Sequence, residues 1–275
     1  MTKFTDRWKK GHWFSKNPNK AWSEKFFLIY SPVWIVYMGL WMTFRPEIRY
    51  GWGDVGNMVL SIIPVIPLFL YPALFMDIKA VDRKWYESYW FKMNIWIFIF
   101  SCGQYWFTEY FFDVLGMVYT FPHLKWNLDA ELLGSGSQKC PVMMYIITLY
   151  FFMTYHSCSV VLMRRIRTSD LPIRIILWPI MVAACAYLFA AAETIFMASP
   201  LIEDVFYYHD RMRMIKYGSV AYGLFFIVSF PMVSRLDENP EDNWTIGRTL
   251  IEAFATIAMV LYLLDFWTKI IGRLY

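Results

Sequence analysis

The sequence predicts an all-α, polytopic membrane protein, a bundle of about seven transmembrane helices. Hydrophobic residues make up 58% of the 275 residues and charged residues only 17%, whereas about a quarter of a soluble globular chain is charged. Apolar runs of roughly 19 to 25 residues recur, and at ~1.5 Å per residue each is long enough to cross a hydrocarbon layer of ~30 Å. In lipid, such runs satisfy their backbone hydrogen bonds as helices.

A basic N-terminal segment is expected to precede a single helical domain. Residues 1–25 are polar and positively charged without an apolar core, so they are not expected to form a cleavable signal peptide. Residues 26–275 are expected to form one transmembrane domain. Pro64, Pro67 and Pro72 should break or kink its second span. The seven spans are expected near 26–44, 56–76, 90–112, 141–163, 174–198, 214–234 and 248–270.

The positions of the cationic residues predict a cytoplasmic N-terminus. Most of the 26 Lys and Arg residues lie in the N-terminal segment and in the second, fourth and sixth loops, and positive charge stays on the cytoplasmic side. With seven spans, the C-terminus is then outside or lumenal. Arg164 and its basic neighbours are interpreted as a headgroup anchor, and SRLDENPEDNW (234–244) as a solvated loop. The net charge of +4 suits a lipid bilayer as partner; nothing indicates a nucleic-acid partner, and the oligomeric state is left open.

Three acids inside the spans are functional-site hypotheses, because an ionisable group in lipid is costly. Glu109, Glu193 and Asp265 lie past the midpoints of the third, fifth and seventh spans, each about 10 Å toward the outer side. Since these spans run in the same direction, a shared polar pocket in the outer half of the bundle is expected. Each acid also has an ordinary interpretation. Glu193 could be a neutral acid bonded to another helix, Glu109 a solvated helix end beside Asp113, and Asp265 the ion-pair partner of Lys269.

The chemistry of such a pocket follows from its residue types. An unpaired carboxyl in apolar surroundings, such as Glu193, favours its protonated form, which is the state that a proton donor needs. A lone intramembrane histidine is more often a core residue than a ligand, and a bis-histidine haem would need a second one. A cage of aromatic rings can bind a flat apolar ligand and stabilise a carbocation. The candidate substrate-binding residues are Tyr105, Trp106, Tyr110, Tyr119, His156, Phe189 and Asp265.

Six segments carry a family resemblance, and they follow in order over nearly the whole chain. They are NPNKAWSEKFFLIYSPVWI (17–35), YWFKMNIWIFIF (89–100), YFFDVLGMVYTFP (110–122), YHSCSVVLMRRIR (155–167), ETIFMA (193–198) and IVSFPMVSRLDENPEDNW (227–244). Together they resemble the cycloeucalenol cycloisomerase family, the plant cyclopropyl sterol isomerases.

This resemblance implies an isomerase of sterol biosynthesis that opens the 9β,19-cyclopropane ring of a sterol, from cycloeucalenol to an obtusifoliol type. The product has a C8=C9 double bond and a new C19 methyl group, and neither a redox cofactor nor a metal is expected. Such a reaction needs a neutral acid, a stabilised cation, a base and the exclusion of water. Because its ETI motif matches the family pattern, the resemblance implies that Glu193 is the acid or a member of an acid pair.

Glu109 is the second catalytic candidate, although the plant members have histidine at this place in the T-x-YFF motif. Loop 127–140 is expected to be longer than in the plant form, to lie on the outer side, and to cover the pocket or contact the sterol. The first expected substrate is a 4α-methyl cyclopropyl sterol, with a 4,4-dimethyl sterol left open. The expected membrane is the endoplasmic reticulum in a eukaryote or the inner membrane in a bacterium.

Two rival functions are considered beside this one. Another sterol double-bond isomerase would need similar acid chemistry on an intact ring system. A non-catalytic sterol-binding seven-helix receptor or carrier would need none. A retinal receptor would need a lysine near the middle of the seventh span, where this chain has only Lys269 near the end.

Overall fold

The computed structural model describes residues 4–44, 52–76 and 84–275. Segments 45–51 and 77–83, which supply some of the cations used to predict orientation, lie outside the described residues. Among the described residues, five helical spans are long and apolar enough to cross a membrane: Gly53–Phe75, Val142–Arg167, Arg174–Met197, Arg211–Ser234 and Ile246–Ile271. The predicted all-α, polytopic membrane architecture is therefore confirmed.

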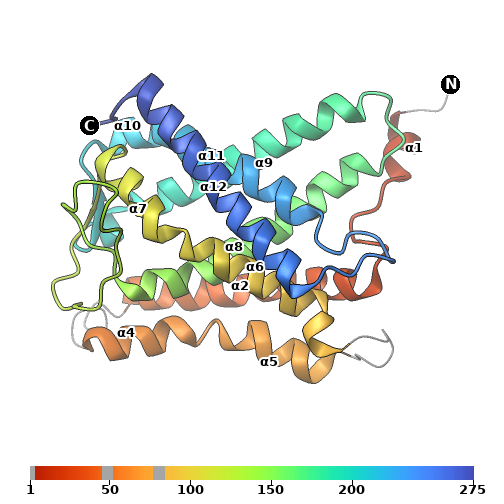
Figure 1. The fold of residues 1–275 in the computed structure, drawn as a ribbon, viewed down its shortest axis with the longest axis horizontal. Coiled ribbons are helices and arrows are strands. Elements are labelled where there is room, and N and C mark those ends of the chain that lie inside the picture. The colour runs from red at the N-terminus through yellow and green to blue at the C-terminus, as the bar shows by residue number, and fades with distance from the viewer. Residues whose placement is uncertain (1–3, 45–51, 77–83) are drawn as a thin grey trace.

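The long helices run back and forth between two ends of the bundle (Figure 1). They are α2 (Pro18–Phe44), α4 (Gly53–Ile62) continued by α5 (Ile66–Phe75), α6 (Tyr89–Cys102) continued by α7 (Gln104–Asp113), α8 (Val142–Arg167), α9 (Arg174–Met197), α11 (Ser219–Ser234) and α12 (Ile246–Ile271). Short helical pieces join them: α1 (Phe4–Lys9), η2 (Trp85–Glu87), η3 (Pro200–Ile202), α10 (Arg211–Arg213) and the π-helical turn η4 (Met214–Gly218).

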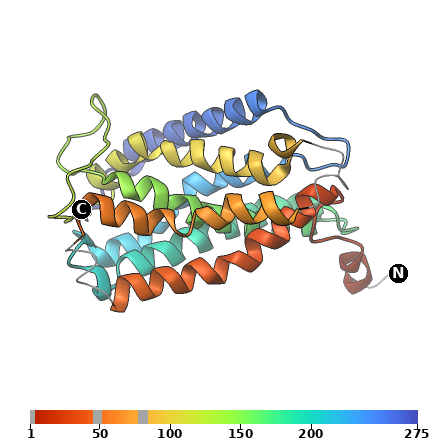
Figure 2. The same cartoon turned by 90° about the horizontal axis from the view of Figure 1, so that it is seen from below.

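The two ends of the bundle carry different elements, and we call them the sheet end and the network end. The sheet end carries the antiparallel strands β1 (Met117–Tyr119) and β2 (Phe206–Tyr208) and lies near the C-terminus (Figure 1). The network end carries α1, the start of α2 and loop 235–245, and lies near the N-terminus. Figure 2 shows the rods lying roughly parallel between these ends.

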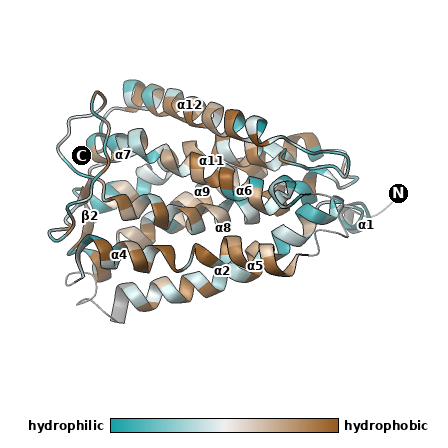
Figure 3. Cartoon of the chain, turned by 60° about the horizontal axis from the view of Figure 1, so that its bottom comes forward, coloured by the Kyte–Doolittle hydropathy of each residue, from teal (hydrophilic) through white to brown (hydrophobic). Residues whose placement is uncertain are grey.

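Helix α8 lies at the centre and packs on α2, α4, α6, α9 and α11, while α12 packs mainly on α6 and α11. Large aromatic side chains fill the core between them; those that are almost fully buried include Trp96, Phe100, Phe107, Phe225, Phe226 and Phe230. Large aliphatic side chains such as Ile29, Leu74 and Ile175 are exposed, and hydrophilic segments gather toward the two ends (Figure 3). This distribution suits a lipid-facing belt around a tightly packed interior.

Prolines break the second span between α4 and α5, as the sequence predicts, and neighbouring side chains repair the backbone. Pro64 lacks an N–H, and the carbonyl four residues before it accepts a hydrogen bond from Tyr37 Oη at 2.9 Å. The carbonyl four residues before Pro72 accepts one from Asn94 Nδ2 at 3.0 Å. A backbone carbonyl without a hydrogen-bond donor costs several kcal/mol in lipid. The side chains of Tyr37 and Asn94 offset this cost at the two prolines.

The third predicted span, 90–112, is divided at Gly103 into α6 and α7. A Cβ at this position would overlap the ring of Phe107 and the carbonyl oxygen of Phe100. Glycine therefore lets the ring of Phe107 lie over the break. This break determines which face of α7 points into the bundle.

Candidate active site

A cavity lies at the sheet end among α7, α8, α9 and α11, and we call it the acid cavity. Its polar lining comes from Gln104, Thr108, Thr148, Glu193, Tyr119, Tyr208 and Tyr222, and its apolar lining from Phe107, Phe111, Met117, Met144, Phe152, Met197, Phe206 and Phe225. A single carboxyl thus stands among many aromatic rings, and no Lys or Arg side chain is part of this lining.

Small residues bring Glu193 close to α11. Ala186 and Ala190 of α9 are completely buried, and a Cβ added to Gly223 of α11 would meet the Ala186 backbone at 3.7 Å. Small residues at such contacts let two helices in a membrane approach closely. Glu193 lies one turn after Ala190 on α9. Because the two helices are close there, its side chain reaches Tyr222 of α11.

The hydroxyl groups of Tyr222 and Tyr155 are hydrogen-bonding partners of the Glu193 carboxyl. Its Oε2 atom is buried without a hydrogen-bond partner among the described residues. Phe189 stacks on Tyr155 with ring centroids 4.9 Å apart and holds that ring in place. The two phenols can donate to this carboxyl, and no cationic side chain is part of the cavity lining beside it.

The two strands form the outer wall of the acid cavity. Because side chains alternate along a strand, β1 turns Met117 and Tyr119 toward the cavity and β2 turns Phe206 and Tyr208 the same way. Burial raises the pKa of Tyr119 and of Tyr208, so both phenols stay protonated and can donate hydrogen bonds. Sequence analysis did not predict these strands, and three-residue segments such as MVY and FYY give too short an alternation to do so.

The structure divides the predicted site residues into two groups. Glu193 and Tyr119 line the acid cavity. Tyr105, Trp106, Glu109 and Tyr110 do not, because α7 turns the face containing Gln104, Phe107, Thr108 and Phe111 toward it. Asp265 is exposed on α12, which packs on α6 and α11 rather than on α9. The expectation of one pocket for three acids is corrected accordingly, since helices at the same depth need not be neighbours.

Glu109 is buried beneath loop 127–140. Its carboxyl lies against the backbone of Gly134 and Gly136, and a Cβ at Gly134 would overlap it. The neighbouring acid, Asp113, accepts hydrogen bonds from the N–H and Oγ of Ser135 at 2.6 and 2.5 Å. The loop therefore rests on two acids of α7, and its own residues are not part of the acid-cavity lining.

His156 is completely buried and both of its ring nitrogens are engaged. Nδ1 lies 2.7 Å from the Phe152 carbonyl oxygen and Nε2 lies 2.9 Å from Ser229 Oγ. These contacts fit a neutral ring that donates from Nδ1 and accepts at Nε2. The ring packs edge-on against Phe230, with centroids 4.9 Å apart. His156, predicted to bind substrate, is not part of the acid-cavity lining, and it joins α8 to α11.

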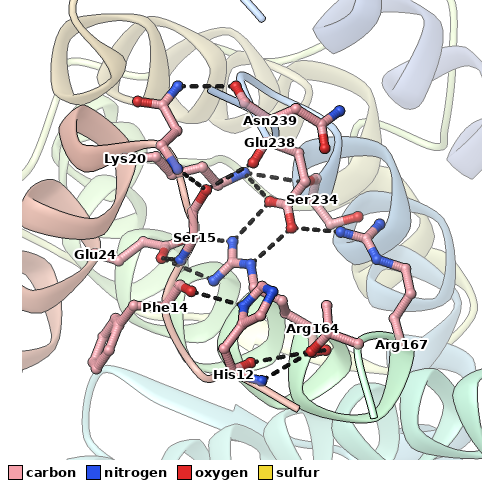
Figure 4. A network of polar contacts seen from close by, with 12 residues as sticks. His12, Phe14, Ser15, Lys20, Glu24, Arg164, Arg167, Ser234, Glu238 and Asn239 are labelled. Carbon is pink, nitrogen blue, oxygen red and sulfur yellow. Dashed lines mark hydrogen bonds and ion pairs between the residues drawn. The ribbon is translucent and has the colours of Figure 1, made fainter. Parts of the chain in front are cut away.

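A buried network of charges occupies the network end (Figure 4). Arg164 donates five hydrogen bonds: two to Glu24, two to Glu238 and one to the Trp13 carbonyl, at 2.5 to 2.9 Å. A guanidinium has five N–H donors, so this group is fully satisfied. Lys20 lies 2.9 Å from Glu238 Oε2 and also donates to two backbone carbonyls of the segment 234–236.

A second buried pair, Lys92 and Asp237, extends this network. Both side chains are inaccessible to solvent, and Lys92 also donates to Asn243 and to the Trp244 carbonyl at 2.9 and 3.1 Å. The interpretation of Arg164 as a headgroup anchor is therefore wrong, as is that of Asp237 and Glu238 as solvated residues. Their opposite charges lie far apart in the sequence, which is why the pairing was not predicted.

The titration of Glu238 reflects this surrounding. Burial acts to raise its pKa, but hydrogen bonds from Arg164 and the charge of Lys20 outweigh burial and lower the pKa to about 2. Glu238 therefore stays ionised at neutral pH and ties loop 235–245 to α8 and α2. In the part of the chain that the structure describes, no three His, Cys, Asp or Glu side chains gather as metal ligands would.

Comparison with known proteins identifies a relative that matches nearly the whole chain. No family model and no solved structure matches the chain. A cycloeucalenol cycloisomerase from Arabidopsis thaliana is 33% identical over 267 residues, which cover 94% of this chain and 89% of that relative. A similarity that spans nearly both full lengths confirms the resemblance seen in the sequence motifs, and the chain belongs to the cycloeucalenol cycloisomerase family.

Proposed function

We propose that this protein is an isomerase that opens the 9β,19-cyclopropane ring of a sterol in the acid cavity, with Glu193 as the proton donor. The observation that carries the proposal is the position of Glu193, the one carboxyl in the lining of an aromatic cavity. The lining of this cavity is mainly aromatic and apolar, which suits an apolar ligand. The name of the Arabidopsis relative supports the same reaction class.

The reaction needs one proton added and one removed. Glu193 delivers its proton to C19 as the C9–C19 bond breaks, and the two electrons of that bond form the new C–H bond. The positive charge is left on C9, where the π faces of rings such as Phe107 and Phe225 stabilise it. Loss of the proton on C8 then forms the C8=C9 bond. We propose that the Glu193 carboxylate takes up this proton, which restores the neutral acid.

The hydroxyls of Tyr155 and Tyr222 stabilise the carboxylate that exists between the two proton transfers. Glu109 has a supporting role in this proposal: it seats loop 127–140 at the sheet end. The substrate that we propose first is a 4α-methyl sterol, cycloeucalenol; the 4,4-dimethyl sterol cycloartenol is the comparison that tests it. We also propose that the network end faces the cytoplasm, because the cationic tail lies there.

Replacement of Glu193 by glutamine tests the proposal. Glu193→Gln keeps the size of the side chain and removes its acidic proton, so we expect turnover of cycloeucalenol to fall at least about 100-fold. The measurement is product analysis by gas chromatography and mass spectrometry with purified protein. Glu203→Gln, an exposed acid just beyond α9, is the matched control and should keep wild-type turnover.

The same assay separates the rival functions. Wild-type turnover by Glu193→Gln would refute the role of this acid. Wild-type protein that binds cycloeucalenol and leaves it unchanged would support a receptor or carrier. Rearrangement of a sterol that has a double bond and no cyclopropane ring, without opening of cycloeucalenol, would support another sterol isomerase.

A further inference from the structure

A second cavity lies beside the acid cavity at the sheet end, and we call it the apolar cavity. It lies between α2, α4, α8 and the end of α9. The two cavities share three wall residues, Met144, Met197 and Phe206. Helix α8 separates them, with Thr148 and Phe152 facing the acid cavity and Ile147 and Phe151 facing the apolar cavity.

The lining of the apolar cavity contains two side chains with polar groups, Trp41 and Asn57. Trp41 is 8% exposed, and its Nε1–H is buried without a hydrogen-bond partner among the described residues. Leaving a buried donor unpaired is costly, and native structures rarely do so without a reason. The indole N–H is thus available for a ligand that enters this cavity.

Asn57 supplies the complementary group. Its side chain is 2% exposed, and Nδ2 donates to the Gly53 carbonyl at 2.8 Å. The amide oxygen is therefore the acceptor that this side chain can offer to the cavity. One donor and one acceptor in an otherwise apolar chamber match a single hydroxyl group, which accepts one hydrogen bond and donates another.

We propose that the apolar cavity binds the hydroxyl end of the sterol. Trp41 Nε1–H donates to the hydroxyl oxygen, and the hydroxyl proton is donated to the Asn57 amide oxygen. The identity of the ligand as a sterol rests on the proposed function. An apolar lining matches the rest of such a molecule.

The shared wall provides the connection to Glu193. Met144 and Met197 have unbranched, flexible thioether side chains that adapt to irregular spaces, and both border the two cavities. A change of their rotamers joins the cavities into one continuous space. A sterol held by its hydroxyl in the apolar cavity then extends across this wall toward the acid cavity.

Competition binding with two ligands tests the proposal. Purified full-length protein in lipid nanodiscs is saturated with tritiated cycloeucalenol, and unlabelled cycloeucalenol or its 3-deoxy analogue displaces it. Wild-type protein should prefer the hydroxyl-bearing competitor by about tenfold, the size of one or two hydrogen bonds. Trp41→Phe keeps an aromatic ring and removes the N–H, so this preference should fall several-fold while affinity for the 3-deoxy analogue stays the same.

Trp178→Phe is the matched control, because Trp178 borders a groove formed by α9 and α11 and is in the lining of neither cavity. It should keep the wild-type preference. Equal weakening of both competitors by Trp41→Phe would show a packing role and overturn the proposal, as would an unchanged preference. A straight-chain alcohol can be used as a third competitor for the tritiated sterol. If its binding depended on Trp41 as strongly as that of cycloeucalenol, the assignment of the ligand as a sterol would be wrong. If the wild-type protein did not isomerise cycloeucalenol but still preferred the hydroxyl-bearing competitor, the proposed isomerase function would be refuted and the proposed binding site would be supported.

Discussion

At the scale of single residues, the proposed chemistry depends on one carboxyl, Glu193, in a cavity lining that contains no Lys or Arg. Glu193 stands out because it has no cation near it in an apolar run, and the structure places it in the acid cavity. The cavity face of α7 could not be predicted in the same way. Aromatic residues occur all round that helix, so periodicity does not distinguish Phe107 from Trp106.

A change at Tyr222 tests how the carboxylate of Glu193 is stabilised. Tyr222→Phe keeps the ring and removes one hydrogen-bonding partner of that carboxyl. Since the partner matters most after the proton has left, we expect kcat to fall about 10- to 100-fold and KM to change little. Steady-state kinetics with cycloeucalenol measure both. Tyr217→Phe, a change at an exposed tyrosine of η4, should leave kcat and KM unaltered. If Tyr222→Phe raised KM by a similar factor and left kcat unchanged, Tyr222 would have a binding role instead.

At the scale of elements, a helix break caused by proline could be predicted from the sequence. Contacts between segments that lie far apart in the sequence could not. Proline has no N–H, and the break between α4 and α5 follows from that fact alone. Strands β1 and β2 need each other across about 90 residues of sequence. The loop resting on Glu109 and Asp113 likewise depends on glycines that only the folded chain brings to α7.

Two neighbouring glycines allow this loop contact to be tested. Gly134 and Gly136 both have positive φ, 86° and 66°, so alanine is strained at either position. A Cβ at Gly134 would also collide with the Glu109 carboxyl, whereas a Cβ at Gly136 meets nothing within 4 Å. We therefore expect Gly134→Ala to destabilise the protein by about 1–3 kcal/mol more than Gly136→Ala. Thermal unfolding in detergent measures the difference.

A double mutant identifies the cause of that difference. In a Glu109→Ala background the collision is removed, so the extra cost of Gly134→Ala should disappear and leave only the backbone strain shared with Gly136→Ala. Equal destabilisation by the two alanines in the wild-type background would contradict the contact between the loop and Glu109.

At the scale of the whole molecule, the two ends of the bundle differ in their polar groups. The sheet end has the cavities and a carboxyl without a cation, and the network end has balanced ion pairs that join α2, α8 and loop 235–245. Composition and hydropathy predicted the bundle, because the physics of lipid allows few alternatives to helices. They could not predict the network, since Glu24 and Arg164 are 140 residues apart and only the packed helices bring them together.

The network predicts how stability depends on pH. The pKa of Glu238 is about 2 in the folded protein against an ordinary value of 4.5. A carboxyl whose pKa is lowered by folding stabilises the fold fully above its unfolded pKa, and this stability is lost as the pH falls toward the folded value. Unfolding should therefore become easier between about pH 4.5 and pH 2, by on the order of 3 kcal/mol from this group.

Thermal unfolding in detergent from pH 6 to pH 2.5 measures this dependence, and Glu238→Gln should remove this part of it. The variant should also be less stable than wild type at neutral pH by about 3–5 kcal/mol, because Arg164 and Lys20 lose a carboxylate while remaining buried. Glu203→Gln, whose parent side chain is exposed, should keep the wild-type profile. If Glu238→Gln kept both the neutral stability and the acid slope of wild type, the ion pairs at the network end would not be what holds the N-terminal segment and loop 235–245 against α8.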